Sequence, residues 1–249
     1  MNSENKIEYK VLGVKNETEN IFTLSLETPD GAPLSFLPGQ YINVYFPELG
    51  TPEGKSYSIS SLPGAKNFSL SVRTIGEFSN RLASRTKGDI ILGSEPYGYF
   101  YSESENSPLV LIASGIGIAP FRGMILDQLQ KNPDRPIRLF YGSRTLSGAA
   151  FREELEELSA KHPNFRLRYF ITRDKPEHPL VEYGRMSGEK IFSVLAGWNE
   201  EDRKDGKNPA KTEGPEFLIC GSIEFTRDLW RSLRTAGAPE ESIYTEAFF

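Results

Sequence analysis

The chain has 249 residues, a formal net charge of −5 and a single cysteine, Cys220. Nucleic acid and anionic membranes both require clustered positive charge, so a mildly acidic chain is not expected to bind either of them. A single cysteine excludes a disulfide framework, a thiolate-only zinc site and a resident iron–sulfur cluster, each of which needs several cysteines. The two histidines, His162 and His178, are too few for a histidine-rich centre, so no metal is expected.

The N-terminal stretch MNSENKIEYK is polar and contains no apolar core, so no secretory signal is predicted. No apolar run reaches the roughly 18 residues that a membrane-spanning helix needs. We therefore expect no membrane insertion and a location in the cytoplasm. We also expect a monomeric chain.

The first part of the chain, residues 6–100, alternates between polar and apolar side chains with a period of two. Glycine and proline interrupt the alternation with turn signals such as TPDG and LPG. Many short strands at this spacing predict an antiparallel β-barrel. One helix is expected, over residues 79–86, with Ser79 as its N-cap. The predicted strands are 6–14, 20–28, 40–47, 56–61, 67–74 and 90–95.

The pattern changes after Ser102, where strand-like and helix-like segments begin to alternate. The apolar run PLVLIAS at 108–114 is typical of a strand buried on both faces. Such alternation predicts a doubly wound parallel α/β sheet. The polar stretch SESENS marks the boundary, which gives a barrel domain over 1–102 and an α/β domain over 103–249. The strands predicted after 108–114 are 136–142, 165–171, 216–220 and 242–245, and the predicted helices are 119–131, 148–161, 187–197 and 223–236.

Residues 198–216 contain ten charged residues in nineteen. We expect a solvated surface loop between a helix and a strand, because long polar loops are usually variable. A docking role is the alternative.

Two segments of the barrel half carry candidate chemistry. In Lys55-Ser-Tyr-Ser, the cation can reach a phosphate, Tyr57 can stack on a flat ring, and Ser58 can form a hydrogen bond with the edge of that ring. The alternative is a plain strand with alternating hydroxyls. Gly76 and Ser79 stand at the start of the predicted helix, where backbone N–H groups bind anions. The alternative there is an ordinary N-cap.

Two more segments lie in the α/β half. Gly115, Gly117 and Pro120 follow a buried strand and open a helix, which is the context in which glycines admit a pyrophosphate. Cys220 and Gly221 end a later strand of the same sheet, on the side where ligands of such sheets bind. The alternative for Cys220 is a small buried core residue.

Taken together, in this order and spacing, the four segments resemble the ferredoxin–NADP⁺ reductase superfamily, and the resemblance covers nearly the whole chain. Lys55 departs from the pattern, because the family usually has arginine there; lysine keeps the charge but loses the bidentate fork. The residues that match the family's motifs are Lys55, Tyr57, Ser58, Ser61, Gly76, Ser79, Gly115, Gly117, Pro120, Cys220 and Gly221.

The resemblance implies an FAD-dependent enzyme that transfers hydride between a nicotinamide and the flavin. It implies that Tyr57 and Phe248 stack on opposite flavin faces and that Ser58 forms a hydrogen bond with flavin N5. Cys220 and Glu246 would line the nicotinamide pocket, although Glu246 also fits an ordinary surface carboxylate. The implied catalytic residues are Ser58, Cys220 and Glu246. The backbone at Val72, Arg73 and Thr74 would follow the ribityl chain.

The choice between NADPH and NADH depends on the charge around the adenosine ribose. Ser143 with Arg144, and Thr172 with Arg173, stand at strand ends and are candidates for contact with a 2′-phosphate; the second pair resembles the family's Ser-Arg pair. Tyr183 and Arg185 are expected to add contacts. Asp174 argues for NADH, and the balance favours NADPH.

The expected partner is an electron-carrier protein: ferredoxin, flavodoxin or an oxygenase component. A flavin reductase that uses diffusible flavin is one alternative, and the reductase component of a multicomponent oxygenase is another. A non-catalytic electron-relay subunit is the third, and intact Cys220 and Glu246 argue against it.

Overall fold

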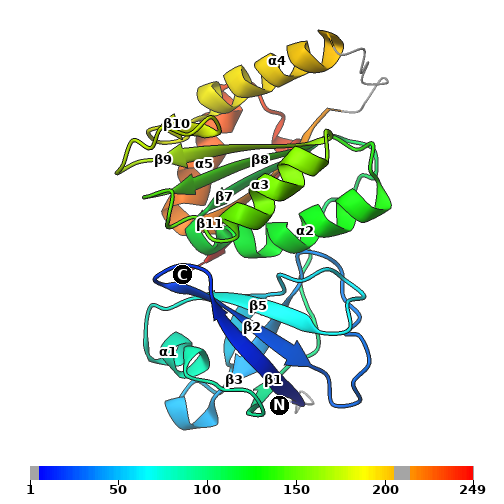
Figure 1. Ribbon diagram of the computed structural model, residues 1–249, viewed down its shortest axis with the longest axis vertical. Helices are drawn as coiled ribbons and strands as arrows, with labels where there is room; N and C mark the ends of the chain where they lie inside the picture. Colours follow the sequence, from blue (N-terminus) through cyan, green and yellow to red (C-terminus); the bar gives the residue numbers. More distant parts are fainter. Residues whose placement is uncertain (1–5, 205–213, 249) are drawn as a thin grey trace. The chain divides into compact units, whose positions relative to one another are not determined.

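The computed structural model describes residues 6–204 and 214–248 (Figure 1). The chain divides into two compact units. One unit comprises residues 1–101 together with 119–131, and the other comprises 102–118 together with 132–249. Each unit contains its own six-stranded sheet.

The first unit is an antiparallel barrel with the strand order β4-β3-β6-β1-β2-β5. Its open edges meet where Ile59 forms a bridge with Leu70 and the Ser60 N–H donates to the Ser69 carbonyl over 2.8 Å. Closure removes the unpaired strand edges, and the predicted barrel is thereby confirmed. The strands are β1 (Ile7–Asn16), β2 (Ile21–Glu27), β3 (Tyr41–Tyr45), β4 (Lys55–Ser58), β5 (Phe68–Arg73) and β6 (Ile90–Gly93).

Alternation along these strands fills the barrel with apolar side chains. Phe68, Leu70 and Val72 point into the core, while Ser69 and Ser71 lie on the other face of the same strand. These serines are also buried, and their hydroxyls form a hydrogen-bonded network with Ser60. Both faces of this part of the barrel wall are therefore covered.

Helix α2 (Ile118–Lys131) covers the seam at which the barrel closes; its residues 119–131 group with the barrel. Arg122 Nη1 donates to the Ser60 carbonyl over 2.7 Å. A Cβ atom at Gly123 would stand 2.8 Å from the Ser61 carbonyl oxygen, so this helix approaches the strand more closely than any side chain allows. The segment that follows Ser58 is thus held by direct contacts with the helix backbone.

The second unit is a parallel sheet with the order β10-β9-β8-β7-β11-β12. Helices α4 and α5 bury one face of it around a core that includes Phe140, Ile219 and Leu229, while α3 contacts β9 (Figure 1). The predicted doubly wound sheet is confirmed. Its strands are β7 (Leu109–Ser114), β8 (Ile137–Ser143), β9 (Phe165–Ile171), β10 (Val181–Tyr183), β11 (Glu216–Ser222) and β12 (Ile243–Phe248), and its helices are α3 (Arg152–Lys161), α4 (Gly188–Lys204) and α5 (Ile223–Thr235).

Two predicted helices have different bounds. The helix predicted over 148–161 begins only at Arg152, because residues 144–151 form a compact loop. The helix predicted to end at 197 continues to Lys204, so residues 198–204 are not part of a loop. Trp198 is buried, and Asp202 forms an ion pair with Arg138 at 2.8 Å, which fixes the last turns to the sheet. The rest of the predicted loop falls partly on 205–213, outside the described residues.

The helix of the barrel unit also differs from its prediction. Helix α1 spans Glu77–Ala83 with Gly76 as its N-cap, so the assignment of Ser79 as the N-cap is wrong. Ser79 lies one turn inside the helix, where its hydroxyl accepts hydrogen bonds from the Ile75 and Gly76 N–H groups at 2.9 and 3.2 Å. A hydroxyl at this position braces the turn that leads into the helix.

We expect Gly123→Ala to destabilise the protein, because the new methyl group would force α2 away from the Ser61 carbonyl. Overpacking of this kind costs about 1–3 kcal/mol. The matched control is Gly197→Ala, which lies in α4 with no atom near the added methyl and should be neutral or stabilising. Thermal unfolding of both variants tests this, and equal melting temperatures would contradict the close approach.

Candidate functional site

Ser58 ends strand β4 with its side chain buried at 3% exposure. Its Oγ has no hydrogen-bond partner within the described residues. A buried hydroxyl without a partner loses its hydration without compensation, and such groups mark sites that a ligand completes. Ser58 Oγ is therefore a candidate contact for a polar ligand atom.

Tyr57 and Lys55 flank this hydroxyl on the same strand. Tyr57 is half-buried, its ring centroid lies 6.2 Å from that of Phe78, and burial raises its pKa above the ordinary value. Lys55 is exposed, with its Nζ 5.7 Å from the centre of the Phe78 ring. Strand β4 therefore presents an exposed cation, an aromatic ring and a buried hydroxyl in the order that the sequence predicts.

The neighbouring segment at the end of β5 keeps its backbone in place through hydrogen bonds to the turn that precedes β2. The Thr74 N–H and hydroxyl both donate to the Asn20 carbonyl, over 2.9 and 3.2 Å. Val72 points into the barrel core, and Arg73 is exposed. Only the backbone of Val72 is thus available to a ligand, whereas Arg73 offers its charge.

Sequence reasoning missed Tyr41. This residue pairs directly with Ser58 across β3 and β4, and a Cβ at Gly98 would stand 3.0 Å from its ring. No local signal marks Tyr41, because its place beside Ser58 depends on the register of two strands.

In the second unit, Gly115–Gly117, which we call the glycine turn, forms a short 3-10 turn after β7. Gly115 has a φ of +55°, a left-handed value that favours glycine, and the space around it is open. A Cβ at Gly117 would lie 2.1 Å from the Cys220 carbonyl oxygen. Pro120 stands in the first turn of α2, as predicted.

Cys220 and Glu246 are register partners on β11 and β12. Cys220 is fully buried, and burial raises the pKa of its thiol well above the ordinary value. Glu246 is half-buried, its Oε2 has no hydrogen-bond partner within the described chain, and burial raises its pKa to about 7. The pair offers a neutral thiol and a carboxyl group that exchanges a proton near neutral pH. Gly221 follows Cys220 and would clash with the Phe225 ring if it carried a side chain.

A cavity of about 440 Å³ lies beyond the ends of β8 and β9. We call it the arginine pocket. Three of its residues are arginines, and no carboxylate lines it. None of the three arginines forms an ion pair within the residues that the structure describes. Ser143, which the sequence places with Arg144, does not line the pocket. The lining residues are Arg144, Thr172, Arg173, Tyr183, Gly184 and Arg185.

Two groups lie close to the pocket that sequence reasoning did not single out. Lys175 Nζ stands 4.5 Å from the centre of the Tyr183 ring. Lys190 Nζ donates to the Arg185 carbonyl over 3.2 Å. Together with the arginines, they give this part of the unit a concentration of positive charge that suits an anion.

Within the described residues, no helix is long and apolar enough to cross a membrane. Over the same ranges, no three histidine, cysteine or acidic side chains converge as a metal site would require.

Comparison with known proteins identifies relatives. The family model for an oxidoreductase NAD-binding domain matches residues 111–230. A flavohemoprotein of Rhizobium meliloti is 32% identical over 244 residues, which are 93% of this chain and 58% of that protein. The electron transfer component of toluate 1,2-dioxygenase from Pseudomonas putida is 31% identical over 197 residues, which are 75% of this chain and 58% of that protein. The chain thus spans less than two thirds of the length of these curated relatives.

A solved structure resembles the chain over both units. The ferredoxin NADP⁺ reductase from Neisseria gonorrhoeae with bound FAD and NADP matches with a TM-score of 0.75 and 25% sequence identity. The match covers 98% of this chain and 99% of that one.

We expect Glu246→Gln to change the pH dependence of stability. The pKa of Glu246 rises from 4.5 to about 7 on folding, so the native state holds a proton that the unfolded state releases within this window. The free energy of unfolding of the wild type therefore falls as pH rises through the window, by up to about 3 kcal/mol. Glutamine stays neutral and avoids this loss.

The variant should thus be more stable than the wild type at pH 8 and equally stable at pH 4.5. Thermal unfolding across this range measures the difference, with the exposed Glu241→Gln as the control. A constant difference at all pH values would mean that Glu246 is ionised in the native state.

Proposed function

Because this chain belongs to the ferredoxin–NADP⁺ reductase superfamily, we propose that it transfers hydride from NADPH to FAD and delivers electrons to a separate carrier protein. The family supports the enzyme class that we propose, an FAD-dependent oxidoreductase that uses a pyridine nucleotide. The preference for NADPH, the roles of individual residues and the identity of the acceptor are the proposal. The arginine pocket is the observation that carries it.

The barrel unit would hold the flavin. The orphaned Ser58 hydroxyl fits a hydrogen bond to the polar edge of the ring, Tyr57 offers a stacking face, and Lys55 offers a charge to the diphosphate. FAD, when bound, accepts two electrons as hydride and releases them singly. The remaining flavin contacts stay predictions: the Val72, Arg73 and Thr74 segment, Gly76 with Ser79, and the ring of Phe248.

The α/β unit would hold the nucleotide. The open glycine turn admits the diphosphate, since neither side chain nor backbone fills the space beside Gly115. Near the nicotinamide, the Cys220 thiol would stay protonated, because burial raises its pKa, and it would present a small neutral group to the ring. Glu246 keeps or releases a proton near neutral pH, which gives this end of the site a pH-sensitive charge.

The arginine pocket favours NADPH over NADH. A 2′-phosphate brings about two negative charges, and arginine binds phosphate through paired N–H groups. A site for the 2′-hydroxyl of NADH would place a carboxylate there, and the pocket lining contains none. Asp174 and Glu182, the acidic residues adjacent in sequence to lining residues, both lie outside the lining.

The acceptor is a redox protein: ferredoxin, flavodoxin or the terminal component of an oxygenase. The similarity to the electron transfer component of a toluate dioxygenase supports the oxygenase component as a specific candidate. Reduction of each carrier by the purified protein with NADPH separates these acceptors. Free flavin consumed as a substrate by a colourless protein would instead indicate a flavin reductase, and a protein without NADPH-dependent diaphorase activity would be a non-catalytic relay.

We expect Ser58→Ala to stabilise the flavin-free protein and to weaken FAD binding. Removing a buried hydroxyl without a partner relieves a cost of about 1–3 kcal/mol, while the holoprotein loses a hydrogen bond. The matched control is Ser60→Ala, whose equally buried hydroxyl bonds to Ser69 and Ser71. That variant should be less stable and should keep its FAD affinity. The melting temperature without FAD measures the effect on stability, and FAD titration measures the effect on binding. A parallel response of the two variants would contradict the assignment of Ser58 to the flavin site.

We expect Arg173→Ala to raise KM for NADPH while leaving kcat and the KM for NADH nearly unchanged. A lost charge-assisted hydrogen bond is worth roughly 1.5–3 kcal/mol, which corresponds to about a tenfold to hundredfold effect. Such a contact acts equally in the ground and transition states, so it appears in KM. Arg227→Ala, exposed on α5, is the control. Equal losses with both nucleotides would assign Arg173 to a group that they share.

A further inference from the structure

Tyr141 lies on β8 in the α/β unit and is fully buried, with its ring centroid 6.0 Å from that of Tyr169. Its hydroxyl donates a hydrogen bond to the Gly115 carbonyl over 3.0 Å and accepts one from the Ala150 N–H over 3.1 Å. One buried hydroxyl thus joins two segments that lie about thirty-five residues apart in the chain.

Both segments belong to the proposed nucleotide site. Gly115 begins the glycine turn. Ala150 belongs to the loop 144–151, which starts with Arg144 of the arginine pocket. The loop is compact: the Gly148 and Ala149 N–H groups donate to the Thr145 and Leu146 carbonyls, each over 3.2 Å.

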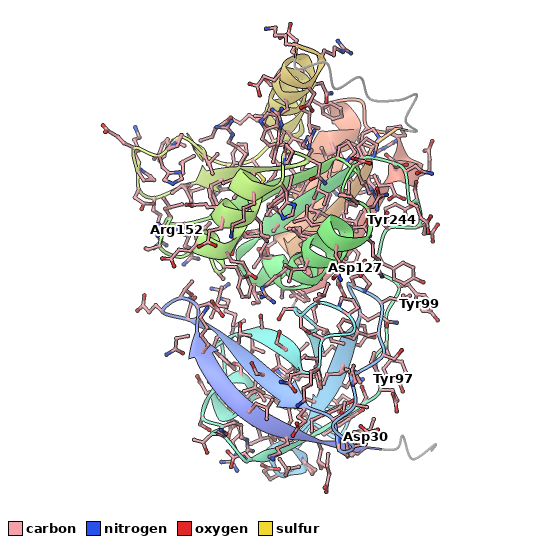
Figure 2. All side chains as sticks on the ribbon, turned by 45° about the vertical axis from the view of Figure 1, so that its right-hand side comes forward. Asp30, Tyr97, Tyr99, Asp127, Arg152 and Tyr244 are labelled. Atoms are coloured by element: carbon pink, nitrogen blue, oxygen red, sulfur yellow. The ribbon has the colours of Figure 1, made fainter. Side chains whose placement is uncertain are left out.

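The loop ends in a strained residue. Phe151 has a φ of 60° and is the one residue other than glycine with a positive φ in the part of the chain that the structure describes. It precedes Arg152, at the start of α3 (Figure 2). Left-handed backbone at a bulky side chain costs free energy, so it persists only where surrounding contacts impose it. The hydrogen bond to Tyr141 is such a contact, one residue away.

The loop is also linked to Arg173, the second arginine of the pocket. The Arg173 N–H donates to the Arg144 carbonyl over 2.8 Å, which extends the pairing of β8 and β9 into the pocket. A shift of the loop at Ala150 would therefore reach both arginines. The hydroxyl oxygen of Tyr141 thus connects the segment that would bind the diphosphate to the segment that would bind the 2′-phosphate.

We propose that Tyr141 is a positioning residue whose hydroxyl couples the glycine turn to the arginine pocket, so that a nucleotide with a 2′-phosphate holds both segments together. This inference rests on the proposed use of NADPH. Occupation of the pocket orders the loop, and the loop fixes the Gly115 carbonyl through Tyr141. The preference for NADPH over NADH is therefore larger than the direct contacts of the arginines with the 2′-phosphate would provide alone.

The test is Tyr141→Phe, which removes this oxygen and no carbon atom, in the full chain loaded with FAD. Tyr169→Phe is the matched control, because its ring is equally buried but its hydroxyl contacts helix α3, through the Arg152 carbonyl over 3.4 Å and the Glu156 side chain. Loss of the Tyr141 hydroxyl leaves the buried Ala150 N–H without this partner and leaves the Gly115 carbonyl with only its hydrogen bond from the Ile118 N–H, so we expect NADPH dissociation constants to rise about tenfold. NADH binding should weaken by a smaller factor, and kcat should not change.

A double-mutant cycle isolates the coupling. In an Arg144→Ala background, Tyr141→Phe should weaken NADPH binding by the same factor as NADH binding, because the 2′-phosphate no longer contacts the loop through Arg144. An equal effect on NADPH in the presence and absence of Arg144 would overturn the coupling, as would a response matched by Tyr169→Phe.

Hydrogen exchange without nucleotide provides a readout that does not depend on NADPH. Tyr141→Phe should speed amide exchange in both the glycine turn and residues 144–151, and Tyr169→Phe should leave both unchanged. Faster exchange in one segment alone would overturn the inference. Wild-type protein that binds NADPH no better than NADH would instead overturn the proposed function, while the exchange experiment still decides whether the hydroxyl joins the two segments.

Discussion

The α/β unit depends on one close approach between two strand ends. Gly117 follows β7 and lies so near the Cys220 carbonyl of β11 that a Cβ atom would stand 2.1 Å from it. These neighbouring strands mark the point at which the sheet order reverses, and ligands of open α/β sheets bind outside such a point. The absence of a side chain at Gly117 lets the glycine turn pack against Cys220, whose register partner on β12 is Glu246.

Both units contain a buried polar atom that lowers the stability of the fold. Ser58 in the barrel and Glu246 in the sheet each carry a buried oxygen without a hydrogen-bond partner among the described residues. An apolar residue at either position would raise the free energy of unfolding, because burial of an unpaired polar group is unfavourable. By contrast, the hydroxyls of Ser60 and Tyr141 are fully engaged and serve to hold segments in place. In the proposed function, the unpartnered oxygens of Ser58 and Glu246 would contact ligands, and the engaged hydroxyls would support the segments that bind them.

Element types followed from hydrophobic periodicity almost throughout, whereas several boundaries did not. The helix predicted over 148–161 loses its first turn because Ala150 bonds to Tyr141, a residue from another strand. The helix that ends at Lys204 gains two turns because Trp198 and Asp202 find partners on the sheet, although their local sequence is highly charged. Ser79 acts inside α1 instead of capping it, because Gly76 takes the extended conformation that the cap requires. In the two α/β helices a contact distant in sequence outweighed local propensity, whereas the difference at Ser79 is local.

The sequence by itself determined the two sheets, the glycine turn and the ligand-binding residue types, because period-two and strand–helix patterns and glycine positions are local properties of the chain. Tertiary structure alone decided which of those residues meet. The arginine pocket assembles Arg144, Arg173 and Arg185 from two strand ends and a later turn, and no local signal excludes Asp174 from its lining. Tyr41 and Tyr141 acquire their places through strand register and a buried hydrogen bond. Such placements depend on the simultaneous packing of many segments, which no single window of sequence contains.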